Sequence, residues 1–470
     1  MPAPATGGSQ AVTLPPPPPR PTGRRHEWTL RAAARPARLL GPDGPESQLW
    51  TYAEAPLPVL RASRGDSILA RLDNALPEHT AIHWHGVRVP NAMDGVPWVT
   101  QPPVLPGESF TYAFTPPDPG TFFLHPHCNE TGQVGRGMAA VLVVEGDEPE
   151  PSHADLVLAC KDWRLDAAGQ WLPFLTPQGA GRAGTFGTLR TVNAQRAYAA
   201  TIPAHGDIRL RLLNLDSTRL IMPLVRGAEA VVLAVDGVAV PPFPLGAWRL
   251  GPAMRLDLLL RAPAAGAVVE VLDQFPREPF PLARLEAVAS PLASPLAPRP
   301  FAPRGLYAPE IPRPDLHRAE RLSFRFTAAL GGGSMGAGLP PGDPFAALLL
   351  DALCAAGGSL WAINASVWPA GEHARLPPPL AELVAGRSYV FQLENLTPHP
   401  HPIHLHGHSV RVLSQSRQEN PPHWADTVLL LPREKAEIAF VAAPGNWMFH
   451  CHVLEHLETG MMGWFRVRPR

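Results

Sequence analysis

The stretch NWMFHCHVLEHLETGMM, residues 446–462, places Cys451 between His450 and His452 and follows them with His456 and two adjacent methionines. In a β-strand the side chains of residues i and i+2 share one face, and residue i+1 points to the other face. His450 and His452 therefore serve one site, and Cys451 serves another on the opposite side. The stretch predicts a strand that carries ligands for two separate metal sites.

Two pairs of segments indicate that one structural unit occurs twice in the chain. PGTFFLHPH, residues 119–127, matches PGNWMFHCH, residues 444–452. NALPEHTAIHWHG, residues 74–86, matches NLTPHPHPIHLHG, residues 395–407, without a gap. A weaker copy at residues 208–227 lacks the histidines. The repeat length of about 150 residues is that of whole domains rather than of a solenoid, so three consecutive domains are predicted.

The matched segments place histidines in four i, i+2 pairs, so that eight imidazoles can converge from four strands. The pairs are His83 and His85, His125 and His127, His404 and His406, and His450 and His452. Buried imidazoles without partners would leave many ring nitrogens unsatisfied, and metal ligation removes that problem. The alternatives are strand faces exposed to water or a generic His-rich metal-binding tract.

A second kind of site is predicted around the cysteine. A thiolate, two imidazoles and a long axial thioether make up a blue-copper site. His401, His456 and Met461 are the available partners of Cys451, and Met462 is the competing thioether.

The first copy of the repeat keeps the paired histidines but lacks this second site. Thr80 aligns with His401, and Pro126 aligns with Cys451. A random His-rich tract would not produce this asymmetry. We therefore expect a metal cluster between the first and third domains and a single-metal site in the third domain alone.

The composition favours an all-β protein. Sixty prolines, 40 glycines and 45% hydrophobic residues among 470 suit many short strands joined by turns. A net charge of -1 provides no basic field for nucleic acid or an anionic membrane. No apolar run reaches the roughly 18 residues of a membrane helix. The four cysteines, Cys128, Cys160, Cys354 and Cys451, are too few for a disulfide scaffold, and Cys128 is predicted to be a small buried hydrophobe.

Polar and Pro-rich linkers near residues 148 and 315 divide the chain. We predict a disordered Pro-rich leader over residues 1–26, which lacks the apolar core of a signal peptide. The domains are expected at residues 27–148, 149–315 and 316–470, with the second one free of copper ligands. A helix is expected within the third domain at residues 343–356.

These residues resemble the multicopper oxidase family, specifically its three-domain, laccase-like members. The resemblance extends over the chain from about residue 27 and rests on the motifs HWHG, HPH, HPIHLHGH and HCHVLEHLETGMM. It implies three consecutive cupredoxin-like Greek-key β-sandwich domains with four copper ions. By this resemblance, type 2 copper would be held by His83 and His404, one type 3 copper by His85, His125 and His452, the other by His127, His406 and His450, and type 1 copper by His401, Cys451, His456 and axial Met461.

The resemblance also implies the reaction. A laccase-like enzyme couples the one-electron oxidation of phenols or aromatic amines to the four-electron reduction of O2 to water. Single electrons would enter at His456, where an outer-sphere donor need only approach the imidazole. They would then pass through Cys451 to its two neighbouring histidines.

Acids near the cluster are the candidate proton sources. Asp94, in NAMDGVP, resembles the family's aspartate near the cluster, and Glu458 is a second candidate. The ordinary alternatives are a turn-forming Asp-Gly for Asp94 and a solvated charge for Glu458. This chain departs from members with Glu directly after the blue-site histidine, since it has Leu457 there.

Two other functions compete with the laccase-like one. A metallo-oxidase of Cu(I) or Fe(II) would be expected to carry Met-rich segments, because thioethers select Cu(I), whereas this chain has nine methionines. A non-catalytic copper-binding protein would be expected to have lost ligands. We expect O2 and a small donor as partners, a monomer, and a periplasmic or secreted location by resemblance. His399 and His408 lie outside the matched ligand positions and are predicted to be structural.

Overall fold

The structure is a computed structural model that describes residues 19–146, 148, 152–289, 296–328, 359–368, 374 and 376–470. The predicted helix at residues 343–356, Cys354 and residues 1–18 of the predicted leader lie outside this range. Strand β1 begins at Arg25, so the last two residues of the predicted leader belong to a strand.

The all-β prediction is confirmed, because six sheets carry the described fold and its helices are short. The helices are η1 (Asn91–Met93), α1 (Glu130–Gly135), α2 (Pro177–Ala180) and α4 (Leu454–Glu458). No helix of the described residues is long and apolar enough to span a membrane.

The first two sheets have the strand orders β2-β1-β4-β6 and β3-β8-β7-β5. Their strands are β1 (Arg25–Ala37), β2 (Ser47–Thr51), β3 (Val59–Ser63), β4 (Ser67–Asn74), β5 (His83–His85), β6 (Ser109–Phe114), β7 (Gly120–His125) and β8 (Ala140–Glu145).

The next two sheets have the orders β10-β9-β12-β16-β14-β15 and β11-β18-β17-β13. Their strands are β9 (Ala154–Trp163), β10 (Leu189–Val192), β11 (Tyr198–Pro203), β12 (Asp207–Asn214), β13 (Pro223–Arg226), β14 (Ala230–Val235), β15 (Val238–Pro244), β16 (Arg255–Arg261), β17 (Val268–Asp273) and β18 (Phe280–Val288).

The last two sheets have the orders β20-β19-β22-β27-β24-β25 and β21-β29-β28-β23-β26. Their strands are β19 (Glu320–Ala328), β20 (Trp361–Ile363), β21 (Ala381–Val384), β22 (Ser388–Asn395), β23 (His401–Leu405), β24 (Val410–Gln415), β25 (His423–Ala425), β26 (Thr427–Leu430), β27 (Lys435–Val441), β28 (Gly445–Cys451) and β29 (Met462–Arg468).

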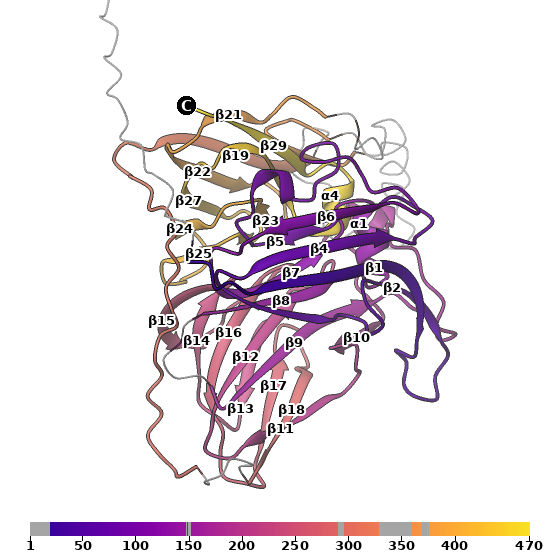
Figure 1. The fold of residues 1–470 in the computed structure, drawn as a ribbon, viewed down its shortest axis with the longest axis vertical. Coiled ribbons are helices and arrows are strands. Elements are labelled where there is room, and N and C mark those ends of the chain that lie inside the picture. Colours follow the sequence, from indigo (N-terminus) through magenta and orange to yellow (C-terminus); the bar gives the residue numbers. More distant parts are fainter. Residues whose placement is uncertain are drawn as a thin grey trace, which may run out of the picture.

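The predicted domain boundaries near residues 148 and 315 fall between β8 and β9 and between β18 and β19. We keep this division as a proposal. In Figure 1 the indigo N-terminal strands lie between the yellow C-terminal strands above and the magenta to pink middle strands below.

Alternation of apolar and polar residues explains why the strands form sandwiches. In β4 the side chains of Ile68, Ala70 and Leu72 are fully buried, while the residues between them are more exposed. One face of such a strand packs in the core and the other faces solvent or a neighbouring layer. Burial of apolar surface, at about 25 cal/mol per Å², then drives the two sheets together.

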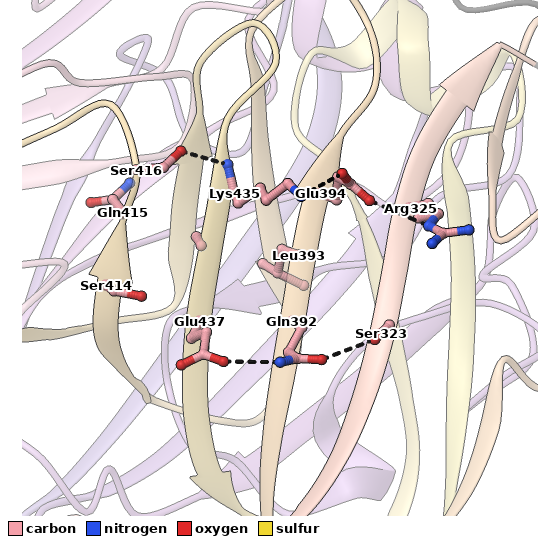
Figure 2. Close-up of a pocket in the computed structure, with 11 residues that line it drawn as sticks. Ser323, Arg325, Gln392, Leu393, Glu394, Ser414, Gln415, Ser416, Lys435 and Glu437 are labelled. Atoms are coloured by element: carbon pink, nitrogen blue, oxygen red, sulfur yellow. Dashed lines mark hydrogen bonds and ion pairs between the residues drawn. The ribbon is translucent and has the colours of Figure 1, made fainter.

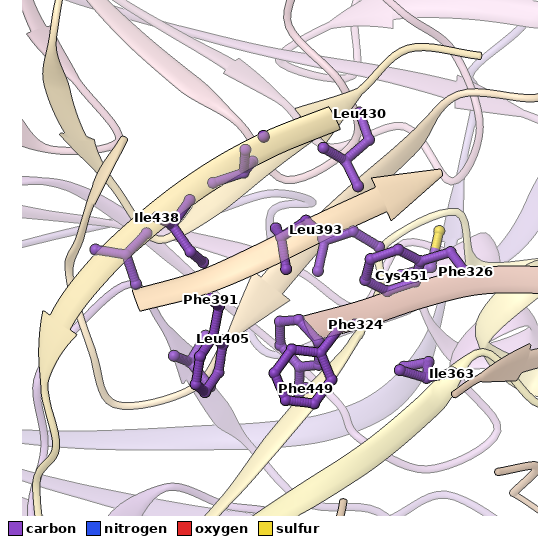
Figure 3. Packing of buried hydrophobic residues seen from close by; sticks show 14 of the residues in the cluster. Phe324, Phe326, Ile363, Phe391, Leu393, Leu405, Leu430, Ile438, Phe449 and Cys451 are labelled. Atoms are coloured by element: carbon purple, nitrogen blue, oxygen red, sulfur yellow. The ribbon is translucent and has the colours of Figure 1, made fainter. Parts of the chain in front are cut away.

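The core of the last sandwich extends directly to the cysteine of the quoted stretch. Phe324, Phe391 and Phe449 pack against one another with ring centroids 4.6–6.2 Å apart. Cys451 lies at one edge of this packing, next to Phe326 (Figure 3). Because β28 is paired on both sides, by β23 and β29, its last five residues are buried and held in one register.

The repeated histidine motifs form equivalent strand pairs in the first and last sandwiches. In the first, β5 lies antiparallel to β7, with His83 opposite His125. In the last, β23 lies antiparallel to β28, with His404 opposite His450. The internal repeat of the sequence is therefore a repeat of strand pairing, which carries histidines from both halves of the chain to one place.

Candidate metal centres

The eight paired histidines meet in one buried cluster. Each of these residues is at most 5% exposed. His406 Nε2 lies 3.0 Å from His450 Nε2 and 3.3 Å from His127 Nε2. Metal–nitrogen bonds to imidazole are about 2 Å long, as for zinc, so nitrogens at these separations can share one ion.

The other rings of the cluster lie against this group. The His83 ring stacks on the His406 ring with centroids 3.8 Å apart, and the His85 ring stacks on the His404 ring at the same distance. The His452 ring centroid lies 5.0 Å from that of His85, and 5.1 Å from that of His125. The sequence prediction that these histidines lie together is therefore matched by the geometry.

Oxygen atoms around the cluster orient most of the imidazoles through the ring nitrogen on the outer side. Main-chain carbonyls lie 2.9–3.0 Å from the Nδ1 atoms of His83, His125, His404 and His450. Carboxylates lie 2.9 Å from the Nδ1 atoms of His127 and His406. A neutral imidazole that donates through Nδ1 has its lone pair on Nε2. These six rings therefore present Nε2 to the interior.

His85 is oriented the other way. Its Nε2 lies 3.0 Å from Asp426 Oδ1 and 3.2 Å from Thr427 Oγ1, so its Nδ1 faces the cluster. The orientation of a metal-binding imidazole follows from the bond that its other nitrogen makes.

Several buried imidazole nitrogens of the cluster have no hydrogen-bond partner among the described residues. They are His83 Nε2, His85 Nδ1, His125 Nε2, His404 Nε2 and both nitrogens of His452. Leaving a buried polar atom unpaired costs about 1–3 kcal/mol, so a group of them at one point needs an occupant. The donor set fits bound metal ions.

The protonation states agree with metal binding. Burial lowers the pKa well below the usual histidine value for six of the eight residues, namely His85, His125, His404, His406, His450 and His452. Neighbouring histidines lower the pKa further because they repel a second positive charge. The rings are therefore neutral, the form that binds a metal.

Cys451 lies at the centre of a second group on the opposite face of β28. Its Sγ is 3.5 Å from His401 Nδ1 and 3.7 Å from His456 Nδ1, and the two imidazole nitrogens are 3.1 Å apart. The Nε2 atom of His401 lies 2.8 Å from Thr397 Oγ1, and that of His456 donates to the Arg182 carbonyl at 2.6 Å. Both rings therefore direct Nδ1 toward the sulfur.

Met461 belongs to the same core cluster as Cys451 and is fully buried. The Cys451 amide donates to the Met461 carbonyl at 3.0 Å, which holds the two residues side by side. Burial raises the pKa of the Cys451 thiol. A bound metal ion would reverse this effect, since a coordinating thiol is deprotonated outright.

The first sandwich has different residues at the corresponding place. Thr80, which aligns with His401, donates through Oγ1 to Gln133 Oε1 at 2.7 Å. A neutral hydrogen bond thus occupies the position of the imidazole, as the alignment predicts.

Asp94 contacts two cluster histidines. Its Oδ2 lies 2.9 Å from His406 Nδ1, and its main-chain carbonyl accepts from His83 Nδ1 at 2.9 Å. The turn-forming role also applies, because Gly95 has φ +81° and an added Cβ would overlap the Ile82 carbonyl. Asp94 is therefore both part of a turn and a support for the cluster.

Glu458 reaches the cluster through Glu130, which lies between it and the histidine. Its Oε1 accepts from the Glu130 amide at 2.7 Å. Glu130 itself, on α1, lies with Oε1 2.9 Å from His127 Nδ1. The sequence reasoning missed Glu130, although an acid three residues after a predicted ligand at the start of a helix was a usable signal.

A buried ion-pair network joins the ligand-free middle sandwich to the cluster. Arg255 on β16 binds Asp426 with Nη1–Oδ1 at 2.8 Å and Nη2–Oδ2 at 2.6 Å. Asp236 accepts from the Arg255 amide at 2.9 Å and from the Asp426 amide at 3.3 Å. Since Asp426 also orients His85, the middle sandwich supports a cluster ligand without supplying one. The sequence reasoning did not identify this network.

His399 and His408 occupy different surroundings. His408 accepts from the Ala443 amide through Nε2 at 2.9 Å, and its Nδ1 lies 2.8 Å from the His406 carbonyl, which is a structural role. The His399 Nε2 has no hydrogen-bond partner among the described residues, and its ring lies 6.5 Å from that of His456.

A polar hollow on the outer face of β19, β22, β24 and β27 is separate from both centres (Figure 2). Its charges neutralise one another, because Glu394 bridges Arg325 at 3.3 Å and Lys435 at 3.1 Å. We interpret it as a solvated sheet face.

The donor set around Cys451 is that of blue-copper proteins, which identifies the class of protein. Two family profiles, both described as multicopper oxidase, match residues 37–149 and 359–470. The multicopper oxidase MmcO of Mycobacterium tuberculosis is 30% identical over 92% of this chain and 86% of its own length. Laccase-1 of Botryotinia fuckeliana is 26% identical over 86% of this chain and 76% of its own.

Among solved structures, a multi-copper oxidase from Pseudomonas thermotolerans superposes with a TM-score of 0.82 at 38% identity, over 94% of this chain and 99% of the other. The chain belongs to the multicopper oxidase family, and its sandwiches have the cupredoxin fold.

Proposed function

We propose that the protein is a laccase-like oxidase that couples one-electron oxidation of phenols or aromatic amines to the four-electron reduction of O2 to water. The observation that carries this proposal is the sequence His450-Cys451-His452 on one strand. Cys451 lies in the single-metal site, and the histidines on either side of it lie in the cluster. One-electron chemistry and four-electron chemistry are thereby joined by adjacent residues.

The proposed ligands follow the two centres. We assign His83 and His404 to type 2 copper, His85, His125 and His452 to one type 3 copper, His127, His406 and His450 to the other, and His401, Cys451, His456 and Met461 to type 1 copper. Bound there, four copper ions would supply a single-electron acceptor and the four electrons that O2 requires.

The protein's own residues provide the electron path, exclude water and orient the imidazoles. Cys451 provides a covalent path of a few bonds to the neighbouring histidines, and burial of both centres excludes water from that path. Carboxylates and carbonyls hold the imidazoles in place, which preorganises the cluster before substrate arrives.

Asp94 is proposed to hold and deliver protons at Oδ2 beside the cluster. We expect Asp94→Asn to keep the copper content, because the amide oxygen can still accept from His406 Nδ1, but to lower kcat about 100-fold through loss of an ionisable group. Asp94→Ala should in addition weaken copper binding about 10-fold to 100-fold. Copper content and kcat, measured for both variants, check this. Unchanged kcat in Asp94→Asn would limit Asp94 to a supporting role.

Glu130 and Glu458 form a second proposed proton route, through the carboxylate at His127 and the carboxylate beyond it. Glu130 contacts His127 directly and Glu458 contacts the Glu130 amide, which supports Glu130 as the inner member.

The function is tested by copper analysis and oxygen uptake on copper-reconstituted protein. We expect four coppers per chain, absorbance at about 600 nm from thiolate-bound copper, and O2 consumption with a phenol. Uptake with Cu(I) or Fe(II) alone would favour the metallo-oxidase alternative. Fewer coppers without turnover would favour a non-catalytic copper protein.

The remaining expectations accompany this proposal. We propose a monomer that uses O2 and a small donor, in a periplasmic or secreted location, as expected for a copper enzyme of this kind.

A further inference from the structure

The outer edge of His456 is covered rather than open to a donor. The residue is 0% exposed, and its Nε2 donates to the Arg182 main-chain carbonyl at 2.6 Å. The expectation that an outer-sphere donor need only approach this imidazole is therefore wrong in its simple form. The main chain at Arg182 meets the imidazole where a donor was expected.

We call residues 176–187, which include α2, the cover segment. Trp361 Nε1 donates to the Ala180 carbonyl of this segment at 2.7 Å, and the Trp361 ring centroid lies 4.7 Å from that of His456. Ala180 is buried in the same core cluster as Cys451. The cover segment therefore packs directly against the single-metal site, although it comes from the middle part of the chain.

A buried carboxylate that the proposed mechanism does not use anchors the cover segment. Glu455 on α4 directly precedes His456 and is 3% exposed. Its Oε1 accepts from the Thr176 amide at 2.8 Å and from Thr185 Oγ1 at 2.9 Å, and its Oε2 accepts from the Thr185 amide. The carboxylate thus fastens the cover segment at two places to the helix that carries His456.

The anchor requires a group that only accepts hydrogen bonds. An ionised carboxylate offers two acceptor oxygens and no proton. A neutral amide of the same shape offers one oxygen and would place an NH2 group against one of the main-chain amides of Thr176 and Thr185. A buried charge is costly unless hydrogen bonds compensate it, and the three donors from the cover segment do so here. The space is also filled, since a Cβ at Gly179 would overlap Thr185 and the Glu455 carboxylate.

The Arg182 carbonyl determines which nitrogen of His456 faces the sulfur. Because Nε2 donates to this carbonyl, the lone pair of the neutral ring lies on Nδ1, which is 3.7 Å from Cys451 Sγ. Arg182 lies in the chain between the two anchored residues, Thr176 and Thr185. Anchoring both residues therefore fixes the position of the carbonyl that orients the imidazole.

We propose that Glu455 is a positioning residue of the single-metal site. By anchoring the cover segment it holds the Arg182 carbonyl on His456 Nε2, and it thereby keeps Nδ1 of His456 directed at the metal. Outer partners of metal-binding imidazoles typically change metal affinity about 10-fold to 100-fold. This inference rests on the proposed function, in which His456 is a ligand of type 1 copper.

The first test uses Glu455→Gln in the copper-free protein, where the substitution should release one end of the cover segment. We expect the Nε2 proton of His456, followed by NMR on protein with isotope-labelled histidine, to exchange with solvent about tenfold faster than in the wild type, because local opening costs fewer hydrogen bonds. The rate at which iodoacetamide alkylates Cys451, followed by peptide mass spectrometry, should rise by a similar factor.

Gly179→Ala separates position from charge. The added methyl group pushes against Thr185 and the Glu455 carboxylate, while Glu455 stays ionised. The same increases of about tenfold are expected in the copper-free protein. In the copper-loaded protein, both variants should lose the absorbance at about 600 nm to a chelator about tenfold faster than the wild type, with the cluster copper retained.

The matched control is Glu382→Gln, which makes the same chemical change on β21 of the same sandwich. Glu382 is 41% exposed and pairs with Arg466 at 3.3 Å. This control should alter neither the exchange of the His456 proton, nor the alkylation of Cys451, nor the loss of copper. Cys128 and Cys160 are buried free thiols that serve as internal controls, and their alkylation rates should stay unchanged in every variant.

Unchanged proton exchange at His456 or an unchanged rate of copper loss in Glu455→Gln would overturn the inference. An effect in Glu455→Gln without one in Gly179→Ala would also overturn it, because the cause would then be charge rather than position. An equal rise at all three thiols would mean that Glu455 supports the whole fold, which again contradicts a positioning role. None of these measurements uses turnover, so absence of O2 uptake with every donor would remove the proposed oxidase function and leave the role of Glu455 in place.

Discussion

We expect Cys451→Ser to abolish the absorbance at about 600 nm and to reduce turnover with every donor to background, because that band and the electron entry both require a copper-bound thiolate. A serine hydroxyl does not supply an equivalent ligand at neutral pH. His450 and His452 face the opposite side of β28, so the cluster should keep its metal. Copper analysis should therefore fall from four ions to three per chain, while the other ions stay bound.

Cys128→Ser is the matched control for this prediction. Cys128 is also a fully buried free thiol, and it follows the cluster residue His127 directly. Its substitution should leave the blue absorbance and the copper count in place. Retention of the visible band in Cys451→Ser, or its loss in Cys128→Ser, would contradict the assignment of the single-metal site.

Arg255→Met should lower the free energy of unfolding of the copper-free protein by about 3–5 kcal/mol, the usual cost of removing one partner from a buried ion pair. The side chain is 0% exposed, and its loss leaves Asp426 and Asp236 buried without their cation. Urea unfolding measures this effect. The matched control is Arg61→Met, which removes a 40% exposed side chain from its ion pairs with Glu145 and Asp155 and should cost no more than about 1 kcal/mol.

The decrease in the free energy of unfolding caused by Arg255→Met should be larger at high pH than at low pH. Burial, with the charge of Asp426 next in importance, raises the pKa of Asp236 to about 7 in the intact network. A carboxyl whose pKa is raised on folding binds more protons in the folded state, so its unfavourable contribution is present above that pKa and is relieved as the pH falls through it. The penalty should therefore be larger at pH 8 than at pH 5 (about one unit or more on either side of the raised pKa). An equal penalty at both values would mean that Asp236 does not carry the stranded charge.

The same variant tests whether the middle sandwich supports the cluster. Because Arg255 holds Asp426 and Asp426 holds His85 Nε2, we expect weaker copper binding at the cluster and an unaltered blue absorbance. Arg255→Lys keeps the charge but cannot make both contacts to the carboxylate, so it should recover part of the stability and less of the copper affinity.

The histidine pairs and the cysteine were predictable because their arrangement depends on local geometry. Strand alternation alone separates Cys451 from His450 and His452, and the internal repeat identifies the two places where such strands recur. Asp94 was found for another reason, namely its resemblance to the family's aspartate near the cluster, and the Asp-Gly turn was the ordinary alternative for it.

The supporting residues were not predictable in this way. Glu130 follows His127 by three residues, which was a usable signal, but the sequence analysis named Glu458 instead, and the structure places the Glu130 carboxylate on the imidazole. Arg255 and Asp426 are 171 positions apart, and Arg182 and His456 are 274 apart. A charged residue in a strand has the same local pattern whether it faces solvent or a buried partner.

Residue types and strand periodicity were enough to predict that the four histidine pairs gather at one centre and that Cys451 serves another, because i and i+2 positions share a face in any β-strand. Packing of the three sandwiches settled which ring nitrogen of each histidine points inward, which acids lie against the cluster, and that the outer edge of His456 is covered by residues 176–187. Those features depend on contacts between distant parts of the chain. Such contacts become strong only when folding buries both partners and removes water from them.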